Sequence, residues 1–340
     1  MNSPAANSKS RKMTIAVDAM SGDYGVRVCV PAALAAAREN PALIFILVGD
    51  KSVLEPMVPA NLSGQIRIQH SSEIVTMDDK PVDALRKKKD SSMRVAINLV
   101  KQGDADACVS AGNTGALMAT AKFVLKTLPG IDRPAIMSAV PAIGGHTHML
   151  DLGANSGCSA DQLFQFGVMG SVVASDFHGM KAPRVGLLNI GSEELKGNDT
   201  VREAHGLLKA SSLNYVGFVE GNDIFKGTVD VVVTDGFTGN ISLKTMEGAA
   251  QMISYSLREE FNRGWLRKLQ ALAALPALRA MRARMDPRRY NGASLLGLNG
   301  IVVKSHGSAD ELAFQNALRT AAVEIEKDVP QQIRRTLEKN

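Results

Sequence analysis

The sequence lacks the features that mark several classes of protein. Its 340 residues include only three cysteines, Cys29, Cys108 and Cys158, which are widely spaced and form no Cys-x-x-Cys pair. This excludes a disulfide scaffold and a thiol-rich metal site, and it favours a reducing, cytoplasmic setting. No run reaches the ~18 apolar residues expected of a membrane-spanning helix. Residues 1–12 are small, polar and basic with no apolar run behind them, which predicts a disordered tail and not a signal peptide.

Several catalytic and nucleotide-binding motifs are also missing. There is no GxxxxGK[ST] loop, and no GxGxxG follows the first predicted strand, so ATP hydrolysis and simple dinucleotide binding lose support. There is no HExxH, no GxSxG and no His/Cys/Cys zinc set. His146 and His148 are a weak metal signal because no acidic residues accompany them. The sequence therefore calls for no metal and no cofactor.

What the chain does contain is an alternation of short β-rich runs with longer helical patterns. The candidate strands are 14–18, 43–49, 66–70, 107–110, 135–140, 147–152, 184–190, 215–219, 229–234 and 301–304. Many are continuous apolar runs that end in glycine or polar residues, which is typical of parallel strands covered by helices on both faces. We therefore predict a three-layer α/β sandwich with a mostly parallel sheet. We expect one catalytic unit over residues 13–340, with ligands beyond the carboxyl ends of the strands.

Two segments resemble each other at a separation of 124 residues. Residues 103–115 read GDADACVSAGNTG and residues 227–239 read GTVDVVVTDGFTG, with six identical positions of thirteen. Each is interpreted as a strand, a glycine turn and the start of a helix, and we predict two loops of one conformation that face one cleft. Backbone N–H groups and the helix dipole favour phosphate or another anion at such a loop. A tight turn without a ligand is the commoner role of any single glycine loop, and it stays open.

Polar side chains gather at the same strand ends. Asn113 and Asn240 are either turn residues or amide donors to an oxyanion. Asp235 opens a predicted helix, where an N-cap is its simplest role. The segment 80–92, KPVDALRKKKDSS, is either a solvated basic helix end or a phosphate-steering patch. His306, in a KSHGS run after the last predicted strand, is either a structural histidine or an acid–base residue.

The strand-end loops carry a family resemblance. The matching words are DAMSGD (18–23), KPVDALRKKKDSSM (80–93), VSAGNTGALMA (109–119), GIDRPA (130–135), DLGAN (151–155), LLNIGSEELKGN (187–198), GNDIF (221–225), DVVVTDGFTGNISLKTMEG (230–248) and ASLLGLNGIVVKSHGSA (293–309). Over nearly its whole length the chain resembles the phosphate acyltransferases of bacterial phospholipid synthesis, the PlsX family. It departs from the family's usual words at Ser21, where glycine is usual, at Tyr24-Gly25-Val26 and at Ser156-Gly157.

The resemblance implies transfer of a fatty acyl group from acyl carrier protein to inorganic phosphate. The product is an acyl phosphate for phosphatidic acid and phospholipid synthesis, which a membrane glycerol-3-phosphate acyltransferase then uses. The resemblance also implies a homodimer and an α/β fold like that of isopropylmalate dehydrogenases and phosphotransacetylases. It implies no settled set of catalytic residues.

The residues suggest how such an enzyme would work. Phosphate is a competent nucleophile near neutral pH, so the protein has to hold it against the thioester carbonyl and stabilise the tetrahedral oxyanion. The expected phosphate ligands are Gly112, Thr114, Gly115, Gly236, Thr238, Gly239 and Arg86. The expected catalytic residues are Asn113, Asp235, Asn240, Lys244 and His306, with Asp235 and His306 as alternatives for handling the proton of the departing thiol.

The positive charge of the chain is concentrated in one segment. Residues 257–290 contain nine Lys or Arg and three Asp or Glu, a net charge of +6, whereas the rest of the chain carries −1. Large apolar residues recur there at helical spacing, and we expect Pro276 to bend or split the helix. We predict an inserted basic amphipathic helical hairpin that lies on an anionic membrane surface, so that the cytoplasmic protein is peripherally attached to the inner face of the cell membrane. The expected surface residues are Trp265, Arg267, Lys268, Leu269, Leu278 and Arg282. Packing on a partner subunit and docking of the acidic acyl carrier protein stay open.

Two other functions compete with acyl transfer. A nicotinamide-dependent decarboxylating dehydrogenase shares the implied fold, although no acidic metal triad is visible in the sequence. A lipid-surface adaptor accounts for the basic hairpin but leaves the polar strand-end loops unexplained. Nucleic-acid binding is disfavoured because large aliphatic residues interrupt the basic cluster.

Overall fold

The computed structural model describes residues 12–284 and 286–339. The chain divides into two compact units: unit 1 comprises residues 12–126 and Leu298–Asp328, and unit 2 comprises Thr127–Gly297 and residues 329–339. The sequence analysis expects a single catalytic unit over 13–340. Apolar runs locate the strands, but they do not reveal which strands pair or how they group into compact units. The predicted tail, residues 1–12, lies outside the described residues except for Lys12.

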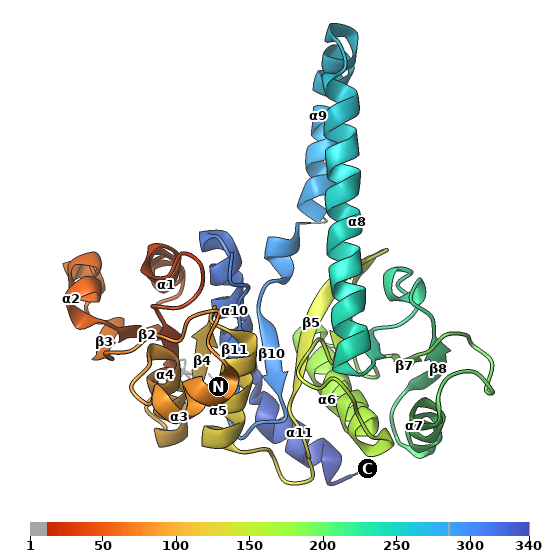
Figure 1. Ribbon diagram of the computed structural model, residues 1–340, viewed down its shortest axis with the longest axis horizontal. Helices are drawn as coiled ribbons and strands as arrows, with labels where there is room; N and C mark the ends of the chain where they lie inside the picture. Colours follow the sequence, from red (N-terminus) through yellow and green to blue (C-terminus); the bar gives the residue numbers. More distant parts are fainter. Residues whose placement is uncertain (1–11, 285, 340) are drawn as a thin grey trace, which may run out of the picture. The chain divides into compact units, whose positions relative to one another are not determined.

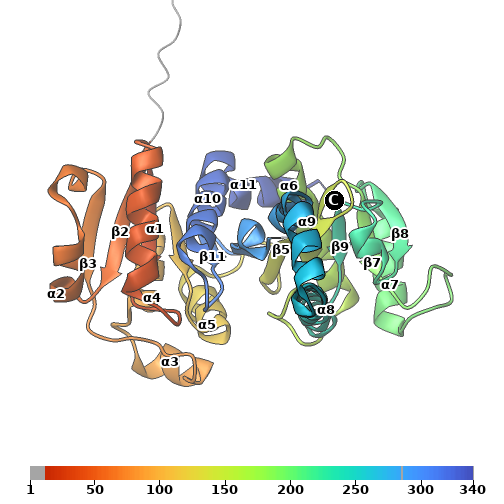
Figure 2. The same ribbon diagram turned by 90° about the horizontal axis from the view of Figure 1, so that it is seen from above.

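Unit 1 is built on a parallel sheet with the strand order β3-β2-β1-β4-β11. Its elements are β1 (Met13–Asp18), α1 (Val26–Glu39), β2 (Leu43–Gly49), α2 (Lys51–Leu54), two 3-10 turns (Glu55–Met57 and Ala60–Leu62), β3 (Ile66–His70), α3 (Pro81–Lys87), α4 (Ser92–Gln102), β4 (Ala107–Ser110), α5 (Thr114–Leu125), β11 (Ile301–Lys304) and α10 (Glu311–Lys327). The strands β2, β4 and β11 are buried along their whole length. Helices α1 and α10 pack together on one face of the sheet, and α4 and α5 cover the other (Figure 2). The predicted layered α/β arrangement with parallel strands is confirmed for this unit.

Small residues bring the first helix close to the sheet of unit 1. Helix α1 buries Ala32, Ala33, Ala36 and Ala37 on its inner face. Alanine has high helix propensity and little bulk, so the helix forms readily and approaches the strands closely. The core between the sheet and the helices is completed by larger side chains such as Phe45, Leu47, Phe314 and Leu318.

Unit 2 contains a mixed sheet with the strand order β10-β5-β6-β9-β7-β8. Its elements are β5 (Ala135–Ala142), β6 (Gly145–Leu150), α6 (Ala160–His178), β7 (Val185–Leu188), α7 (Asp199–Ala210), β8 (Tyr215–Val219), a 3-10 turn (Asp223–Phe225), β9 (Val231–Val233), α8 (Gly236–Asn262), α9 (Trp265–Arg284), a 3-10 turn (Pro287–Tyr290), β10 (Ala293–Leu296) and α11 (Val329–Leu337). Its β10–β5 and β5–β6 pairs are antiparallel, and the remaining pairs are parallel. Helix α6 begins with a capping box between Ser159 and Gln162 and packs against β9, α7 and α11. The sequence does not predict β10 as a strand, because its four residues are bracketed by glycines.

The two longest helices of unit 2 form a hairpin. Helix α8 continues beyond the sheet of its own unit, and α9 returns alongside it (Figure 1). The residues predicted as a basic amphipathic hairpin, 257–290, include the end of α8, which begins at Gly236, and all of α9. That they form an inserted basic amphipathic hairpin stays a prediction. The turn falls at Arg263 and Gly264, and Pro276 lies inside a continuous α9, where its exposed position tolerates the loss of one backbone hydrogen bond. No helix among the described residues is long and apolar enough to cross a membrane.

Candidate functional site

Three buried polar residues lie side by side in register at the carboxyl ends of neighbouring strands in the unit 1 sheet. Asp18 at the end of β1 lies opposite Ser110 at the end of β4, and Lys304 at the end of β11 lies opposite the same Ser110. The side chains of Asp18, Ser110 and Lys304 are buried. Ligands of parallel α/β sheets bind beyond this edge, so the loops that follow these strands form the candidate site of unit 1.

A short hydrogen-bond chain connects Asp18 to the loop that precedes α5. The Ser110 Oγ–H donates to Asp18 Oδ2 at 2.6 Å, and Ser110 Oγ accepts the Gly112 N–H at 3.1 Å. Asp18 is fully buried, and burial raises the pKa of its carboxyl group, whereas the Ser110 hydrogen bond lowers it. Sequence reasoning assigns no role to Asp18 or Ser110, although both stand where a strand ends in a polar residue.

Close packing explains why the loop contains Gly112. A Cβ atom at this position would lie 2.6 Å from Met93 Cε and 3.1 Å from Ser21 Cβ. Ser21, where the family usually has glycine, places its Oγ 3.3 Å from Ser110 Oγ. Gly112 therefore has a packing reason, and its N–H is bonded to Ser110. Its role as a phosphate ligand stays a prediction.

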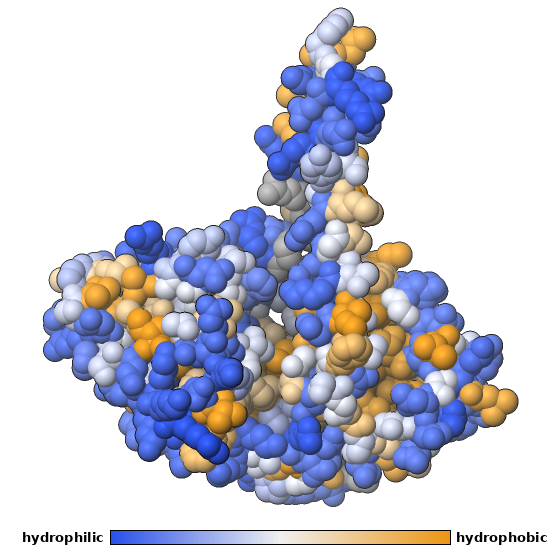
Figure 3. Space-filling view, viewed as in Figure 1, coloured by the Kyte–Doolittle hydropathy of each residue, from blue (hydrophilic) through white to orange (hydrophobic). Residues whose placement is uncertain are grey.

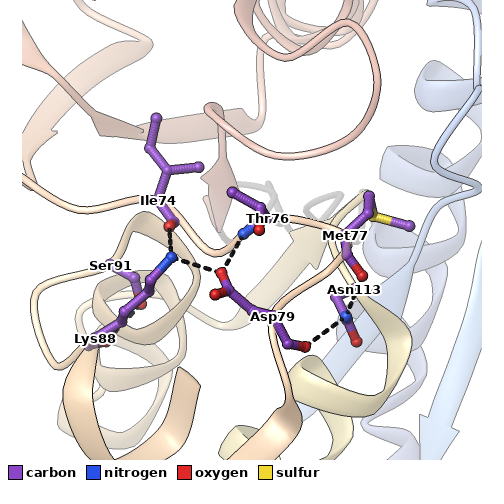
Figure 4. A network of polar contacts seen from close by, with 7 residues as sticks. All are labelled: Ile74, Thr76, Met77, Asp79, Lys88, Ser91 and Asn113. Atoms are coloured by element: carbon purple, nitrogen blue, oxygen red, sulfur yellow. Dashed lines mark hydrogen bonds and ion pairs between the residues drawn. The ribbon is translucent and has the colours of Figure 1, made fainter. Parts of the chain in front are cut away.

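Asn113 is the N-cap of α5 and links it to a neighbouring segment. Its Oδ1 accepts the Ala116 N–H at 3.0 Å. Its Nδ2 donates to Met77 O at 2.7 Å and to Asp79 O at 3.1 Å (Figure 4). Because these bonds use both amide hydrogens, Asn113 has no donor left for a substrate oxyanion in this structure. In this structure Asn113 positions the start of α5, and its predicted catalytic role stays a prediction.

The segment bound by Asn113 is itself held by a lysine from the basic run. Lys88 Nζ donates to Ile74 O at 2.7 Å and to Asp79 Oδ2 at 2.5 Å, and Asp79 Oδ2 also accepts the Thr76 N–H at 2.7 Å (Figure 4). The hydrogen bond from Lys88 holds the pKa of Asp79 below its ordinary range. Lys88 thus supports the start of α5 from outside. Arg86, at the exposed end of α3, takes no part in this network, and its phosphate role stays a prediction.

The first turn of α5 is open to solvent. Thr114 and Gly115 are both exposed, and the first N–H groups of an α-helix have no acceptor within the helix. These groups and the positive end of the helix dipole suit an anion. Gly115 also has a packing reason, since a Cβ there would lie 2.8 Å from Pro81 Cγ at the start of α3. The phosphate roles of Thr114 and Gly115 stay predictions.

The loop after β11 brings a lysine and a histidine to the same edge. Lys304 is 8% exposed, and its Nζ donates to Ala111 O at 3.4 Å and to Ser305 O. His306 is exposed, and its Nδ1 accepts the Ser308 N–H at 3.2 Å. A neutral His306 ring therefore carries its proton on Nε2. The predicted acid–base role of His306 stays a prediction.

In unit 2, a buried aspartate organises the loop that follows β6. Asp151 is fully buried, and its Oδ1 accepts the N–H groups of Ile136 at 2.9 Å and Ala154 at 3.1 Å. Its Oδ2 accepts the backbone N–H of Asn155 at 2.7 Å and the side-chain Nδ2–H of Asn155 at 2.9 Å. Burial raises the pKa of Asp151, and these hydrogen bonds oppose the shift. The DLGAN word is the sequence signal of this loop.

The start of α8 packs directly on the Asp151 loop. A Cβ at Gly236 would lie 2.6 Å from Asn155 O, and one at Gly239 would overlap the backbone carbonyl of Asp151. The Gly236 N–H donates to Asn155 O at 2.7 Å, and the Gly239 N–H donates to Asp235 O at 2.9 Å. Both glycines are therefore explained by close packing, and both of their N–H groups are used. Their role as phosphate ligands stays a prediction.

The simpler interpretation of Asp235, as the N-cap of α8, is confirmed. Its Oδ1 accepts the Thr238 N–H at 2.9 Å, and its Oδ2 accepts the Thr238 Oγ–H at 2.8 Å. Both donors of Thr238 are thus bonded to Asp235 in this structure, and its phosphate role stays a prediction. The acid–base role of Asp235 stays a prediction.

The two similar segments do not adopt the same conformation. In the aligned words, Gly112 corresponds to Gly236, yet α5 begins at Thr114 whereas α8 begins at Gly236 itself. The physical reason is the cap: Asp235 caps α8, but the residue aligned with it is Ala111, which has no oxygen to offer. Helix α5 therefore starts two residues later in the alignment, and the prediction of one shared loop conformation is wrong.

Two candidate donors remain on the first turns of α8. Asn240 and Lys244 are exposed and stand four residues apart, which places them on one side of the helix. The Asn240 side chain lies beside Gly153 of the Asp151 loop, where a Cβ would be 3.7 Å from Asn240 Cγ. Lys244 Nζ forms an ion pair with Glu247 at 2.8 Å. Their donor roles stay predictions.

The hairpin exposes large apolar side chains near its turn. Trp265 is 71% exposed and Leu269 is 54% exposed, whereas Leu278 is half-buried. Figure 3 shows hydrophobic side chains interspersed with hydrophilic ones toward the end of the hairpin. The expected apolar surface therefore exists at the start of α9, and its ligand stays a prediction.

The basic charge of the hairpin is partly neutralised by neighbouring carboxylates. Arg267 forms an ion pair with Glu260, and Arg263 forms another with Glu260 at 2.7 Å. Lys268 is exposed, and no ion pair is recorded for it among the described residues. The side chain of Arg282 lies outside the described residues.

The described residues present neither a metal cluster nor an activated thiol. No group of three or more His, Cys, Asp or Glu side chains among them is placed to hold a metal ion. Burial raises the pKa of Cys29 and Cys108 far above the ordinary value, and it raises the pKa of Cys158 to about 11. None of these thiols is poised as a thiolate nucleophile near neutral pH.

Known proteins are similar to this chain over nearly its whole length. A family model described as "Fatty acid synthesis protein" matches residues 13–332. The phosphate acyltransferase of Methylococcus capsulatus is 60% identical over 94% of this chain and 95% of its own, and that of Nitrosococcus oceani is 59% identical over 96% and 97%. A phosphotransacetylase from Streptococcus pyogenes aligns with a TM-score of 0.61 at 21% identity, over 93% of this chain and 94% of its own, which confirms the predicted fold. The chain therefore belongs to the phosphate acyltransferase family that its strand-end motifs predict.

Proposed function

We propose that this phosphate acyltransferase takes a fatty acyl group from the thioester of acyl carrier protein and transfers it to inorganic phosphate for phospholipid synthesis. The main structural support for a phosphate site is the solvent-exposed first turn of α5. Around it, the hydrogen bonds of Asp18, Ser110 and Asn113 hold the loop, while Thr114 and Gly115 are left exposed. A rigid loop with unused N–H groups at a helix N-terminus suits a phosphate ion.

The reaction needs no covalent enzyme intermediate. A phosphate oxygen attacks the thioester carbonyl carbon, a C–O bond forms, and the C–S bond breaks. The proton carried by hydrogen phosphate passes to the departing thiolate, so the products are an acyl phosphate and a free thiol. The protein contributes by holding phosphate close to the carbonyl and by stabilising the oxyanion with hydrogen-bond donors.

The exposed donors of unit 1 take the phosphate role in this proposal. The N–H groups of Thr114 and Gly115 and the Thr114 hydroxyl bind phosphate oxygens, and Arg86 attracts the anion. His306 is the candidate to assist at the leaving group: its Nε2–H would donate a hydrogen bond to the departing thiolate while the thiolate takes up the proton of hydrogen phosphate. On unit 2, Asn240 and Lys244 are proposed as hydrogen-bond donors to an anion.

Trapping of the product tests the activity directly. The full chain is incubated with an acyl carrier protein thioester and phosphate, and hydroxylamine converts acyl phosphate to a hydroxamate. We expect hydroxamate that depends on phosphate. Reduction of a nicotinamide cofactor by a hydroxy acid, without any hydroxamate, would favour the dehydrogenase instead, and binding to lipid with neither activity would favour an adaptor.

Two substitutions test the site against a structural effect. Asn240→Ala is expected to lower turnover about 10²-fold, as loss of one oxyanion donor typically does. Asn262→Ala at the end of the same helix is the control, because it changes the same side chain far along α8. Wild-type turnover in a folded Asn240→Ala variant would remove Asn240 from the proposal.

We also propose that the end of the hairpin binds the anionic inner face of the cell membrane. Exposed Trp265 and Leu269 would enter the headgroup region, while Lys268 would meet acidic lipids. Such attachment delivers the acyl phosphate to a membrane acyltransferase. Packing of the hairpin against a second copy of the chain in a homodimer is the alternative. Trp265→Ala is expected to weaken co-sedimentation with anionic vesicles; an unchanged vesicle fraction with loss of the dimer would favour the subunit contact.

A further inference from the structure

A second basic region lies on unit 1. Residues 80–126 contain nine Lys or Arg and four Asp or Glu, a net charge of +5. They include α3, α4 and α5, and α5 contacts both of the other helices. We call the outer surface of these three helices the α3–α5 face. Figure 3 shows strongly hydrophilic side chains gathered over α3 beside apolar ones.

An exposed aromatic ring lies among these charges. Phe123 on α5 is 53% exposed, and Val82 on α3 is 57% exposed. The guanidinium of Arg94 lies 5.1 Å from the centroid of the Phe123 ring, and the ammonium of Lys126 lies 4.9 Å from it. Cation–π attraction thus holds two positive charges around one apolar centre. Protein-binding surfaces typically have an apolar, often aromatic, centre surrounded by polar or charged residues, and this surface has the same composition.

The backbone at Lys126 is a separate observation. Its φ is 62°, in the left-handed region that favours glycine. Lysine at this position is less favourable for the fold than glycine would be, yet its side chain extends over Phe123. A lysine is thus present at a strained backbone position, where its charge lies over the exposed Phe123 ring.

We infer that the α3–α5 face docks the acidic carrier protein that brings the acyl thioester. This inference rests on the proposed function, in which the acyl donor is a carrier protein. The positive rim complements an acidic partner and accelerates its encounter, while Phe123 and Val82 supply the apolar contact. The partner is therefore a folded acidic protein with a small apolar patch among its carboxylates.

The position of the face along α5 suits delivery of a thioester. Thr114 begins α5 at the proposed phosphate site, and Phe123 lies nine residues further along the same helix. At 1.5 Å per residue this separation is about 14 Å. A flexible arm on a carrier protein seated at Phe123 would extend about this far along the helix to bring its carbonyl carbon to Thr114.

Direct binding tests the docking surface without relying on catalysis. Binding of holo acyl carrier protein to the full chain is measured at low salt for the wild type and for Lys122→Glu, which reverses an exposed charge next to Phe123. We expect Kd to rise about tenfold, and added salt to reduce the difference. Lys181→Glu, in the exposed turn before β7, makes the same charge change on unit 2 and is expected to leave Kd within about twofold. Equal Kd values for Lys122→Glu and wild type would overturn the inference.

A second variant separates binding from folding. Lys126→Gly removes the charge but suits the left-handed backbone, so we expect a higher melting temperature together with weaker carrier binding. A variant with unchanged carrier affinity would count against the inference.

Kinetics then connect the surface to the reaction. Phe123→Ala is expected to raise KM for the carrier thioester with little change in kcat, and to leave transfer from a small pantetheine thioester unchanged. An equal loss with both donors would contradict a docking role. If the wild type makes acyl phosphate from neither donor, the proposed function fails, whereas the binding measurements still decide whether the face binds the carrier.

Discussion

Replacing Ser110 by alanine removes the hydroxyl that joins Asp18 to the loop before α5. In the native chain this hydroxyl donates to Asp18 Oδ2 at 2.6 Å and accepts the Gly112 N–H at 3.1 Å. The substitution leaves a buried carboxylate oxygen and a buried N–H without these partners. Each such group costs about 1–3 kcal/mol, so we expect the free energy of unfolding to fall by about 3 kcal/mol.

The size of this loss is expected to depend on pH. Burial raises the pKa of Asp18, so the native state binds its proton more tightly than the unfolded state does. The stability contributed by Asp18 is therefore full below the unfolded pKa and is lost as the pH rises through the folded pKa. Without the Ser110 hydrogen bond the folded pKa rises further. Ser110→Ala is thus expected to cost less at about pH 4 than at about pH 8.

Chemical denaturation at the two pH values measures the effect. The control is Asp18→Asn, whose side chain does not titrate, so adding Ser110→Ala to it is expected to produce a loss that no longer varies with pH. A loss for Ser110→Ala alone that is equal at both pH values would refute the role of the Asp18 carboxylate. A loss well below about 1 kcal/mol would refute the hydrogen-bond chain itself.

Other consequences of the structure are open to measurement. Gly239→Ala would force a Cβ into a backbone carbonyl and is expected to cost at least about 3 kcal/mol in urea unfolding, whereas Gly248→Ala, in open space on the same helix, is expected to stabilise by up to about 1 kcal/mol. Arg184 holds the pKa of Asp230 below its ordinary value, so the pair stabilises the fold above the unfolded pKa and less as the pH falls; Asp230→Asn is expected to cost about 1 kcal/mol at neutral pH and less near pH 3, because Arg184 is partly solvated. Pro276→Ala restores a backbone donor inside α9 and is expected to slow amide exchange there; faster exchange would contradict a continuous helix.

The hairpin shows how far helical spacing can be read from sequence. The apolar residues that recur from Leu257 onward indicate helices, and helices are found there. Pro276 does not split the helix, because it lies inside a continuous α9 and the turn falls at Gly264. Proline removes only one backbone hydrogen bond, and an exposed helix tolerates this loss. The spacing of apolar residues from Leu257 onward also gives no sign that α8 begins much earlier, at Gly236, where Asp235 is its N-cap.

The candidate site shows a different limit. Sequence reasoning locates the strand ends and the glycine loops correctly, but it counts Gly236 and Gly239 as phosphate ligands. Their N–H groups are in fact bonded to Asn155 and Asp235, and their missing side chains make room for the Asp151 loop. A glycine needed for contact with another backbone and a glycine needed for a ligand look identical in a sequence.

The family, the α/β class and the positions of most strands follow from the order of residues alone. Apolar runs, strand-end motifs and charge are local properties, so they can be recognised in neighbouring residues. Which hydrogen-bond donors are bonded and which are exposed depends instead on how distant segments pack. Asn113 and Thr114 are neighbours, yet one is bonded to Met77 and Asp79 and the other is exposed. Hydrogen bonds across 34 to 36 residues depend on packing, which no local pattern records.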